Sequence, residues 1–200
     1  IFDLTKSLFY ENADDAKASR FLFGVHSGFP SCTHPLFQGS GLWCLNNGVF
    51  KASDKKAIRS FAENAKAGEN STIGKFGLGM KSVFHLCEAF IYIACDGKDV
   101  YSEFLNPWDD GDKESEHPHM DWDQIWNEQQ NADISYIQQT FADYLDADNH
   151  WFLLWIPLRC KAHLQMDNGE EYGSITNSFP GDDPNGLDFL KENELAEKLG

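Results

Sequence analysis

The most informative segment of the chain reads Ile73-Gly74-Lys75-Phe76-Gly77-Leu78-Gly79-Met80-Lys81-Ser82-Val83-Phe84. Its three glycines have the spacing G-x-x-G-x-G and run directly into apolar residues with helical character. Glycine allows backbone conformations and close approaches that a Cβ atom prevents. A helix that begins after such a loop directs its free N–H groups and the positive end of its dipole into the loop. The segment therefore predicts a binding loop for an anion, above all phosphate.

This spacing differs from both common nucleotide-binding patterns. The dinucleotide-binding pattern is G-x-G-x-x-G after a strand, and the phosphate loop of the common NTPases ends in G-K-[ST]. Taken alone, the segment is equally compatible with a glycine-rich turn before a packed helix. The choice between the two interpretations depends on the rest of the chain.

The composition favours a globular domain and argues against nucleic-acid-binding and membrane proteins. The chain has 200 residues, 42% hydrophobic and 14% aromatic, which is typical of one globular domain with a substantial core. A net charge of −16 without a basic cluster argues against direct binding to nucleic acids or anionic membranes. No run approaches the ~20 apolar residues of a membrane span. Five cysteines without paired spacing favour buried free thiols in a reducing compartment, so we expect a cytoplasmic protein.

The N-terminal segment 2–16 has the pattern of an amphipathic helix. Leu4, Leu8, Asn12 and Asp15 fall on one face. The apolar face thus becomes polar near its C-terminal end, with an amide and a carboxylate one turn apart. These two side chains are either solvated or part of a binding site.

The remaining pattern predicts alternating helices and strands. Strands are expected at 20–25, 42–45, 89–94, 99–104 and 151–158, and helices at 55–65, 79–87, 134–145 and from about 187. This order favours a mixed sheet with helices on one face. The acidic, tryptophan-containing segment at about 106–131 has the character of an insertion on that scaffold. Residues 161–200 are expected to form a loop and a helix that lead into a missing downstream region of a longer protein.

One metal site has to be considered. Cys32 and His34 lie close together in a loop, with His85 and Cys87 as remote partners. A Cys-x-His pair without a second well-spaced pair is weak evidence for zinc.

Three motifs carry a family resemblance. They are Glu11-Asn12-Ala13-Asp14-Asp15-Ala16, Asn46-Asn47-Gly48-Val49-Phe50 and the segment from Ile73 to Val83. Their order and separation resemble the GHKL ATPases, the superfamily of gyrase, heat-shock chaperone, histidine-kinase and mismatch-repair ATP-binding domains. The three motifs are most similar to the N-A-D-D-A helix, the N-D-x-x-F turn and the I-G-K-F-G-x-G-x-K-S-V loop of its sacsin-type, chaperone-like branch. The resemblance covers about residues 7–90 and continues loosely through Trp155-Ile156-Pro157-Leu158-Arg159.

The resemblance implies an α+β fold over about residues 1–160. This GHKL or Bergerat ATP-binding fold is a two-layer α/β sandwich with a mixed, mostly antiparallel sheet and helices on one face. ATP and Mg²⁺ are the implied cofactors. Asn12 would bind Mg²⁺, Asp15 and Ala16 would line the nucleotide pocket, and Asn46 would accept the adenine amino proton. The other implied nucleotide-binding positions are Gly48, Lys66, Gly74, Phe76, Gly77, Leu78, Gly79, Met80 and Lys81.

One departure from the family bears on catalysis. The position of the family's general-base glutamate is Leu8, and the nearby Glu11 is rotated by about 100° from Asn12 around the helix. Loss of a general base typically costs about 10²–10⁴-fold in rate. Whether the chain is an enzyme therefore stays open at this point.

Three hypotheses for function follow. The first is a Mg-ATP-binding module of a larger protein, chaperone-like or defence-related, with a nucleotide-driven lid at about 66–72 and slow or no hydrolysis. The second is an active ATPase that uses Glu11 or a base from outside the chain. The third is a nucleotide-free interaction module that keeps only the scaffold. The expected partners are ATP or ADP, other domains of the same polypeptide and a protein client, while a homodimer stays open.

Overall fold

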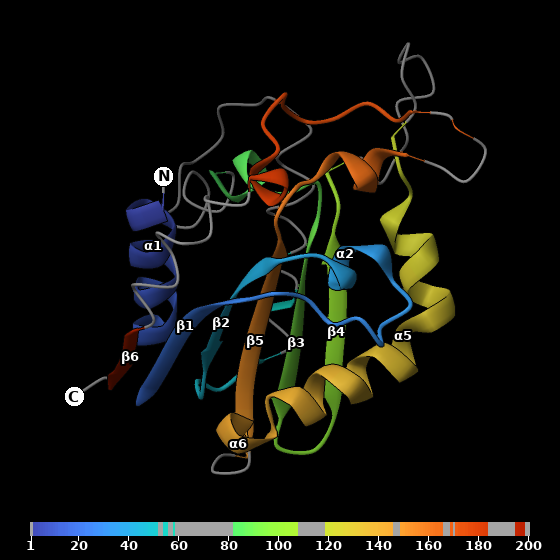
Figure 1. Ribbon diagram of the computed structural model, residues 1–200. Coiled ribbons are helices and arrows are strands. Elements are labelled where there is room, and N and C mark those ends of the chain that lie inside the picture. Colours follow the sequence, from blue (N-terminus) through green and yellow to red (C-terminus); the bar gives the residue numbers. More distant parts are fainter. Residues whose placement is uncertain are drawn as a thin grey trace.

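The computed structural model describes residues 2–51, 54–55, 58, 82–107, 119–145, 149–165, 169, 171–183 and 195–198, with the backbone alone at 2–8, 82, 127–130 and 195–198. One sheet with the strand order β4-β3-β5-β2-β1-β6 organises these residues (Figure 1). Its strands are β1 (Arg20–His26), β2 (Gly41–Asn46), β3 (Phe90–Asp96), β4 (Val100–Leu105), β5 (His150–Pro157) and β6 (Leu195–Lys198). All neighbouring strands in it are antiparallel, so the expected mixed sheet is wrong for the part of the chain described.

Two longer helices and several short helical turns accompany the sheet. They are α1 (Phe2–Asp15), α2 (Pro35–Gln38), α5 (Trp122–Thr140) and α6 (Ala142–Leu145), with the 3₁₀ turns η1 (Ser82–His85), η2 (Lys161–Leu164) and η3 (Pro180–Asp182). The helix expected at 79–87 is a 3₁₀ turn where it is described. The helix predicted at 134–145 belongs to the longer α5 and to α6, and the one predicted at 55–65 lies almost entirely outside the described residues.

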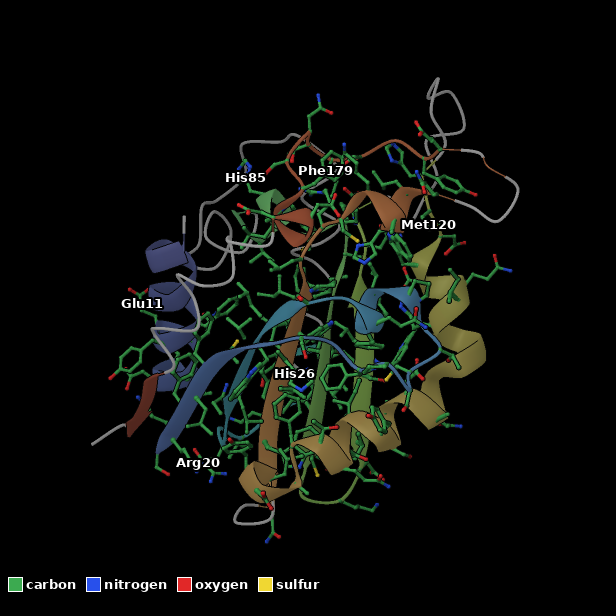
Figure 2. All side chains as sticks on the ribbon, viewed as in Figure 1. Glu11, Arg20, His26, His85, Met120 and Phe179 are labelled. Carbon is green, nitrogen blue, oxygen red and sulfur yellow. The ribbon has the colours of Figure 1, made fainter. Side chains whose placement is uncertain are left out.

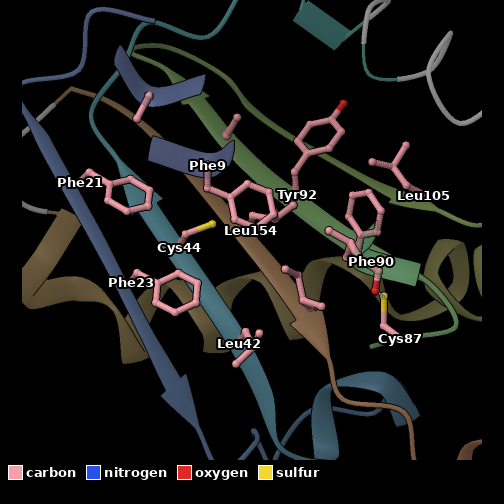
Figure 3. Close-up of a cluster of buried hydrophobic side chains, with 14 of the residues drawn as sticks. Phe9, Phe21, Phe23, Leu42, Cys44, Cys87, Phe90, Tyr92, Leu105 and Leu154 are labelled. Carbon is pink, nitrogen blue, oxygen red and sulfur yellow. Dashed lines mark hydrogen bonds between the residues drawn. The ribbon is translucent and has the colours of Figure 1, made fainter. Parts of the chain in front are cut away.

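Side chains on both faces of the sheet are buried. In β3, Phe90, Tyr92 and Ala94 belong to a first core with α1, whereas Ile91 and Ile93 belong to a second core with α5. Figure 3 shows part of the first core, where Phe9 of α1 lies over the sheet. The first core also holds Ala13, Phe21, Phe23, Leu42, Cys44, Phe50, Val83, Phe84, Cys87, Leu154, Ile156 and Leu158, and the second holds Phe29, Leu36, Phe37, Leu45, Phe104, Trp122, Trp126, Ile137, Phe141, Leu153 and Trp155.

The two-layer arrangement with helices on one face is therefore wrong. α1 packs on one face and α2, α5 and α6 pack on the other. The physical reason can be seen in β5, where every residue from Trp151 to Ile156 is apolar. A strand that is apolar on both sides needs cover on both sides, as strands buried between two layers do.

The acidic segment contributes to this second layer. Trp122 and Trp126 are 1% and 3% exposed and lie in the second core. From residue 119 onward the segment is therefore not peripheral to the scaffold, because the first turns of α5 cover the sheet. The assignment of 106–131 as an insertion stays a prediction. Residues 108–118 lie outside the described part of the chain.

The C-terminal end also differs from expectation. Residues Leu195–Lys198 were expected in a helix, but they form β6, which pairs with β1 and sets Leu195 opposite Phe23. The sequence Leu-Ala-Glu-Lys has good helix propensity, which the hydrogen bonds offered by the edge of β1 outweigh. The division of the chain near residue 160 stays a prediction.

The end of α1 is fixed by a Schellman motif. Lys17 has a φ of 59°, the left-handed conformation typical of this position. The N–H of Lys17 donates to the carbonyl of Asp14, and the N–H of Ala18 donates to that of Ala13, both at 2.9 Å. The motif turns the chain directly into β1 and holds the C-terminal end of α1 against the first core.

Candidate functional site

Two of the three family motifs meet at the C-terminal end of α1. A Cβ atom placed on Gly48 would lie 2.6 Å from the Cβ of Ala16 and 3.2 Å from its carbonyl oxygen. Only glycine fits such an approach without a shift of the backbone. The structure thus places the Asn46–Gly48 turn directly beside the helix end that carries Asn12 and Asp15.

Asparagine side chains hold this turn. Oδ1 of Asn46 accepts the N–H of Gly48 at 2.9 Å, which makes an Asx turn. Oδ1 of Asn47 accepts the N–H groups of Ser19 and Arg20, both at 2.9 Å, and its Nδ2 donates to Oγ of Ser19. Asn47 thereby ties the turn to the start of β1. Sequence reasoning named Asn47 as part of the Asn46-Asn47-Gly48 turn but gave it no role in the site.

Asn46 keeps capacity for a ligand. An amide oxygen has two lone pairs, and the Asx turn uses one of them. The side chain is half-buried. It can therefore accept one further hydrogen bond, as the predicted contact with an adenine amino group requires.

Phe50 anchors the far end of the turn. Its ring stacks on that of Phe152 at 5.9 Å and lies 5.5 Å from Tyr92 and 6.0 Å from Tyr101. These rings come from β3, β4 and β5 and pack on the α1 side of the sheet. Phe50, the last residue of the second family motif, is thus a core residue.

The polar residues of α1 differ in exposure. Asn12 and Ala16 are half-buried beside the fully buried Ala13, while Glu11 and Asp15 are exposed. Figure 2 shows Glu11 on the outer side of α1. Within the described chain, no hydrogen bond engages the side-chain amide of Asn12. The side-chain amide of Asn12 is thus half-buried with no protein partner among the described residues, and Glu11 is turned toward solvent.

Most of the glycine segment lies outside the described part of the chain. The predicted positions Lys66, Gly74, Phe76, Gly77, Leu78, Gly79, Met80 and Lys81 all lie outside the described residues. The chain is described again from Ser82, where η1 begins. Val83, Phe84 and Cys87 then join Phe9 and Ala13 in the first core. The segment therefore ends on the same face of the sheet as α1 and the Asn46–Gly48 turn.

The structure separates the four candidate metal ligands. Cys32 lies in the second core and Cys87 in the first, on opposite faces of the sheet. Nδ1 of His34 accepts the N–H of Leu36 at 3.2 Å, so its Nε2 donates to the carbonyl of Trp122 at 3.2 Å. No group of three or more metal-binding side chains occurs in the described ranges. His34 is a buried structural residue, and all five cysteines are free.

The fold and the site define an α+β domain in which an N-terminal helix and an Asn-Asn-Gly turn meet over one face of an antiparallel sheet. A model of the Sacsin domain family matches residues 5–168, and the chain belongs to this family. Human sacsin is 29% identical over 159 residues, which cover 73% of this chain and 3% of that protein. The chain thus spans a small fraction of its relative's length. None of the described helices is both long and apolar enough to cross a bilayer.

The contact between Gly48 and Ala16 gives a direct test of the site. Gly48→Ala is expected to lower the free energy of unfolding by about 1–3 kcal/mol, because the new Cβ atom overlaps with Ala16. Urea denaturation followed by circular dichroism measures the change. Gly39→Ala is the matched control, since its Cβ atom would meet His163 only at an ordinary 3.5 Å. Equal losses in the two variants would contradict the close contact.

Proposed function

We propose that this chain is a Mg-ATP-binding module of a larger protein, with slow or no hydrolysis and a chaperone-like or defence-related role. The observation that carries the proposal is the contact of Ala16 with Gly48. It brings Asn12, the proposed Mg²⁺ ligand, onto the same side of the sheet as Asn46, the proposed adenine contact. Mg²⁺ prefers hard oxygen ligands and keeps several waters, so a single amide oxygen suffices.

The position of Glu11 favours binding over hydrolysis. On α1, Glu11 is two residues before the buried Ala13, which corresponds to about 200° of rotation around the helix. A base must lie within hydrogen-bond reach of the water that it activates. An exposed Glu11 on the outer side of α1 is poorly placed for a nucleotide that lies over the sheet. An ATPase that uses Glu11, or a base from elsewhere in the full protein, is the alternative.

The nucleotide-free interaction module has lost part of its support. The sequence features that favour it are leucine in place of the general-base glutamate at Leu8, the bulky Phe50 in the second motif, and the tryptophans of the acidic segment as a docking surface. Phe50, Trp122 and Trp126 are buried in the two cores. The proposed lid at 66–72 lies outside the described residues and stays a prediction, as do a cytoplasmic location, a protein client and a homodimer.

Removal of the Asn12 amide tests the proposed Mg-ATP site. The wild-type chain is expected to bind MgATP or MgADP by isothermal titration calorimetry at millimolar concentration or below. Asn12→Ala is expected to raise the Kd for MgATP roughly 10–100-fold, as expected for loss of a contact to a charged group.

The control variant is Asn131→Ala, which removes an exposed amide from α5 and is expected to leave the Kd unchanged. Repeating the titration in excess EDTA should abolish the difference between wild type and Asn12→Ala, because the amide acts through the metal. No binding by the wild-type chain would reject the proposed function.

A further inference from the structure

The chain contains a fully buried arginine, Arg159, directly after β5. Its guanidinium donates to the carbonyls of Phe84 and Cys87, each at 2.6 Å, and to that of His85 at 3.1 Å. In addition, the backbone N–H of Arg159 donates to the carbonyl of Leu86 at 2.7 Å. The planar guanidinium presents five donors in a fixed fork, so it can fix several carbonyls at once. Arg159 therefore holds the turn that follows the glycine segment.

A buried carboxylate completes this cluster. Nε of Arg159 donates to Oε1 of Glu88, which is itself 2% exposed. The same Glu88 oxygen accepts two further hydrogen bonds, from the hydroxyl of Ser174 at 2.6 Å and from the N–H of Ile175 at 3.2 Å. The pair is thus embedded in further hydrogen bonds on the side of residues 174–178.

Residues 174–181 also contact Arg159 directly. Nη1 of Arg159 donates to Oγ1 of Thr176 at 2.9 Å and to the carbonyl of Ser178 at 3.1 Å. The carbonyl of Arg159 accepts the N–H of Gly181 at 2.8 Å. In Figure 2, His85 of η1 and Phe179, the residue before η3, are labelled at the same end of the sheet. One ion pair therefore joins residues 84–88, the end of β5 and residues 174–181.

A gain in stability alone does not explain why an Arg159–Glu88 ion pair is buried here. Removing two charges from water is costly, and apolar residues of similar volume often stabilise a core equally well. A hydrogen-bonded pair, in contrast, fixes a geometry that apolar packing leaves less defined. Here the fixed geometry belongs to the turn that starts at Ser82, immediately after the last predicted phosphate contact, Lys81. That turn also packs in the first core with α1.

We propose that Arg159 is a positioning residue for nucleotide binding, acting through the carbonyls of Phe84, His85 and Cys87 on the described turn that follows Lys81. Glu88 and Thr176 orient its guanidinium. The inference rests on the proposed function and adds to it a residue that touches no nucleotide. Binding energy depends on how well the contacting groups are held before the ligand arrives. A loosened turn should therefore weaken MgATP binding although every residue expected to contact the ligand is retained.

The test compares two cluster variants with a matched variant on the other face of the sheet. Arg159→Lys keeps the positive charge but loses the planar, forked set of N–H donors. Thr176→Val removes the hydroxyl that accepts a hydrogen bond from Nη1 of Arg159. The control is Asp133→Asn, since the buried Asp133 carboxylate accepts the N–H groups of Thr33 and His34 in the second layer. Thermal unfolding of each variant is recorded first, and MgATP titrations are then run at a temperature where all are folded.

Arg159→Lys is expected to raise the Kd for MgATP by about 10-fold and Thr176→Val by less, whereas Asp133→Asn changes it less than about twofold despite its loss of thermal stability. If Arg159→Lys does not fold, Thr176→Val decides. An unchanged Kd in the folded cluster variants overturns the positioning role, as does an equal rise in Asp133→Asn. If the wild-type chain does not bind MgATP, the proposed function is rejected and the positioning role with it. If the wild-type chain binds MgATP and only the variants fail to show the expected pattern, the positioning role alone is rejected.

Discussion

Replacement of Trp122 by alanine is expected to lower the free energy of unfolding by about 3–5 kcal/mol. Trp122 is 1% exposed, and its ring lies 5.9 Å from that of His34 and 6.3 Å from that of His163. Its removal leaves a cavity between α5 and the sheet that these neighbours cannot fill. Urea denaturation of the variant, with the m-value compared to wild type, gives the change in stability.

An exposed aromatic residue of the same region provides the comparison. Tyr144→Ala in α6 removes a side chain that is 43% exposed, and it is expected to cost less than half as much. If Trp122→Ala proved no more costly than Tyr144→Ala, the start of α5 would be a peripheral insertion after all.

The stability of the chain is expected to fall steeply below pH 6.5 because of two buried histidines. Burial lowers the pKa of His34 to about 4, outweighing the opposing effects of the Trp122 carbonyl and Asp133, while His163 adds to the lowering. Burial also lowers the pKa of His163 to about 4. The nearby Asp182 carboxylate acts in the opposite direction, and the Arg159 guanidinium adds to the lowering. Both imidazoles are thus neutral in the folded protein at neutral pH.

The direction follows from proton binding. Between pH 6.5 and 4 the unfolded chain binds a proton at each histidine, and the folded chain does not, so acid favours unfolding. One pKa unit corresponds to about 1.4 kcal/mol, so each histidine withdraws roughly 3 kcal/mol over this range. Two such losses are comparable with the entire stability of a typical domain.

Urea denaturation at pH 7, 6, 5 and 4.5 measures this dependence. His34→Gln and His163→Gln should each remove about half of it, and His85→Gln controls for the loss of an exposed imidazole. A free energy of unfolding that stays constant from pH 7 to 4.5 would show that neither histidine is held neutral.

Local patterns predicted most of the sheet correctly. β1, β2, β3, β4 and β5 all lie within a few residues of their expected positions, because each is a short apolar run bounded by turn residues. The family resemblance assigned the end of α1 and the Asn46–Gly48 turn to one nucleotide pocket, and the two lie in contact in the structure. Their contact could be expected only through the family resemblance, since nothing in the spacing of Ala16 and Gly48 requires it.

What local patterns missed depends on distant partners. The carboxylate of Asp133 pairs with residues about a hundred positions earlier, and Arg159 pairs with residues more than seventy positions earlier. No periodicity reveals such pairs. The acidic residues around Trp122 and Trp126 similarly concealed a helix whose other side is apolar, and the edge of β1 turned a good helical sequence into β6.

The double cover of the sheet restricts how neighbouring parts of a long polypeptide can attach. In the described part of the chain the strands are already covered, by α1 on one face and by α2, α5 and α6 on the other. A neighbouring domain that packed on either face would therefore meet the outer sides of these helices and not the strands themselves. Backbone pairing with such a domain would need a terminal strand of the described sheet, and β4 is the terminal strand on one side.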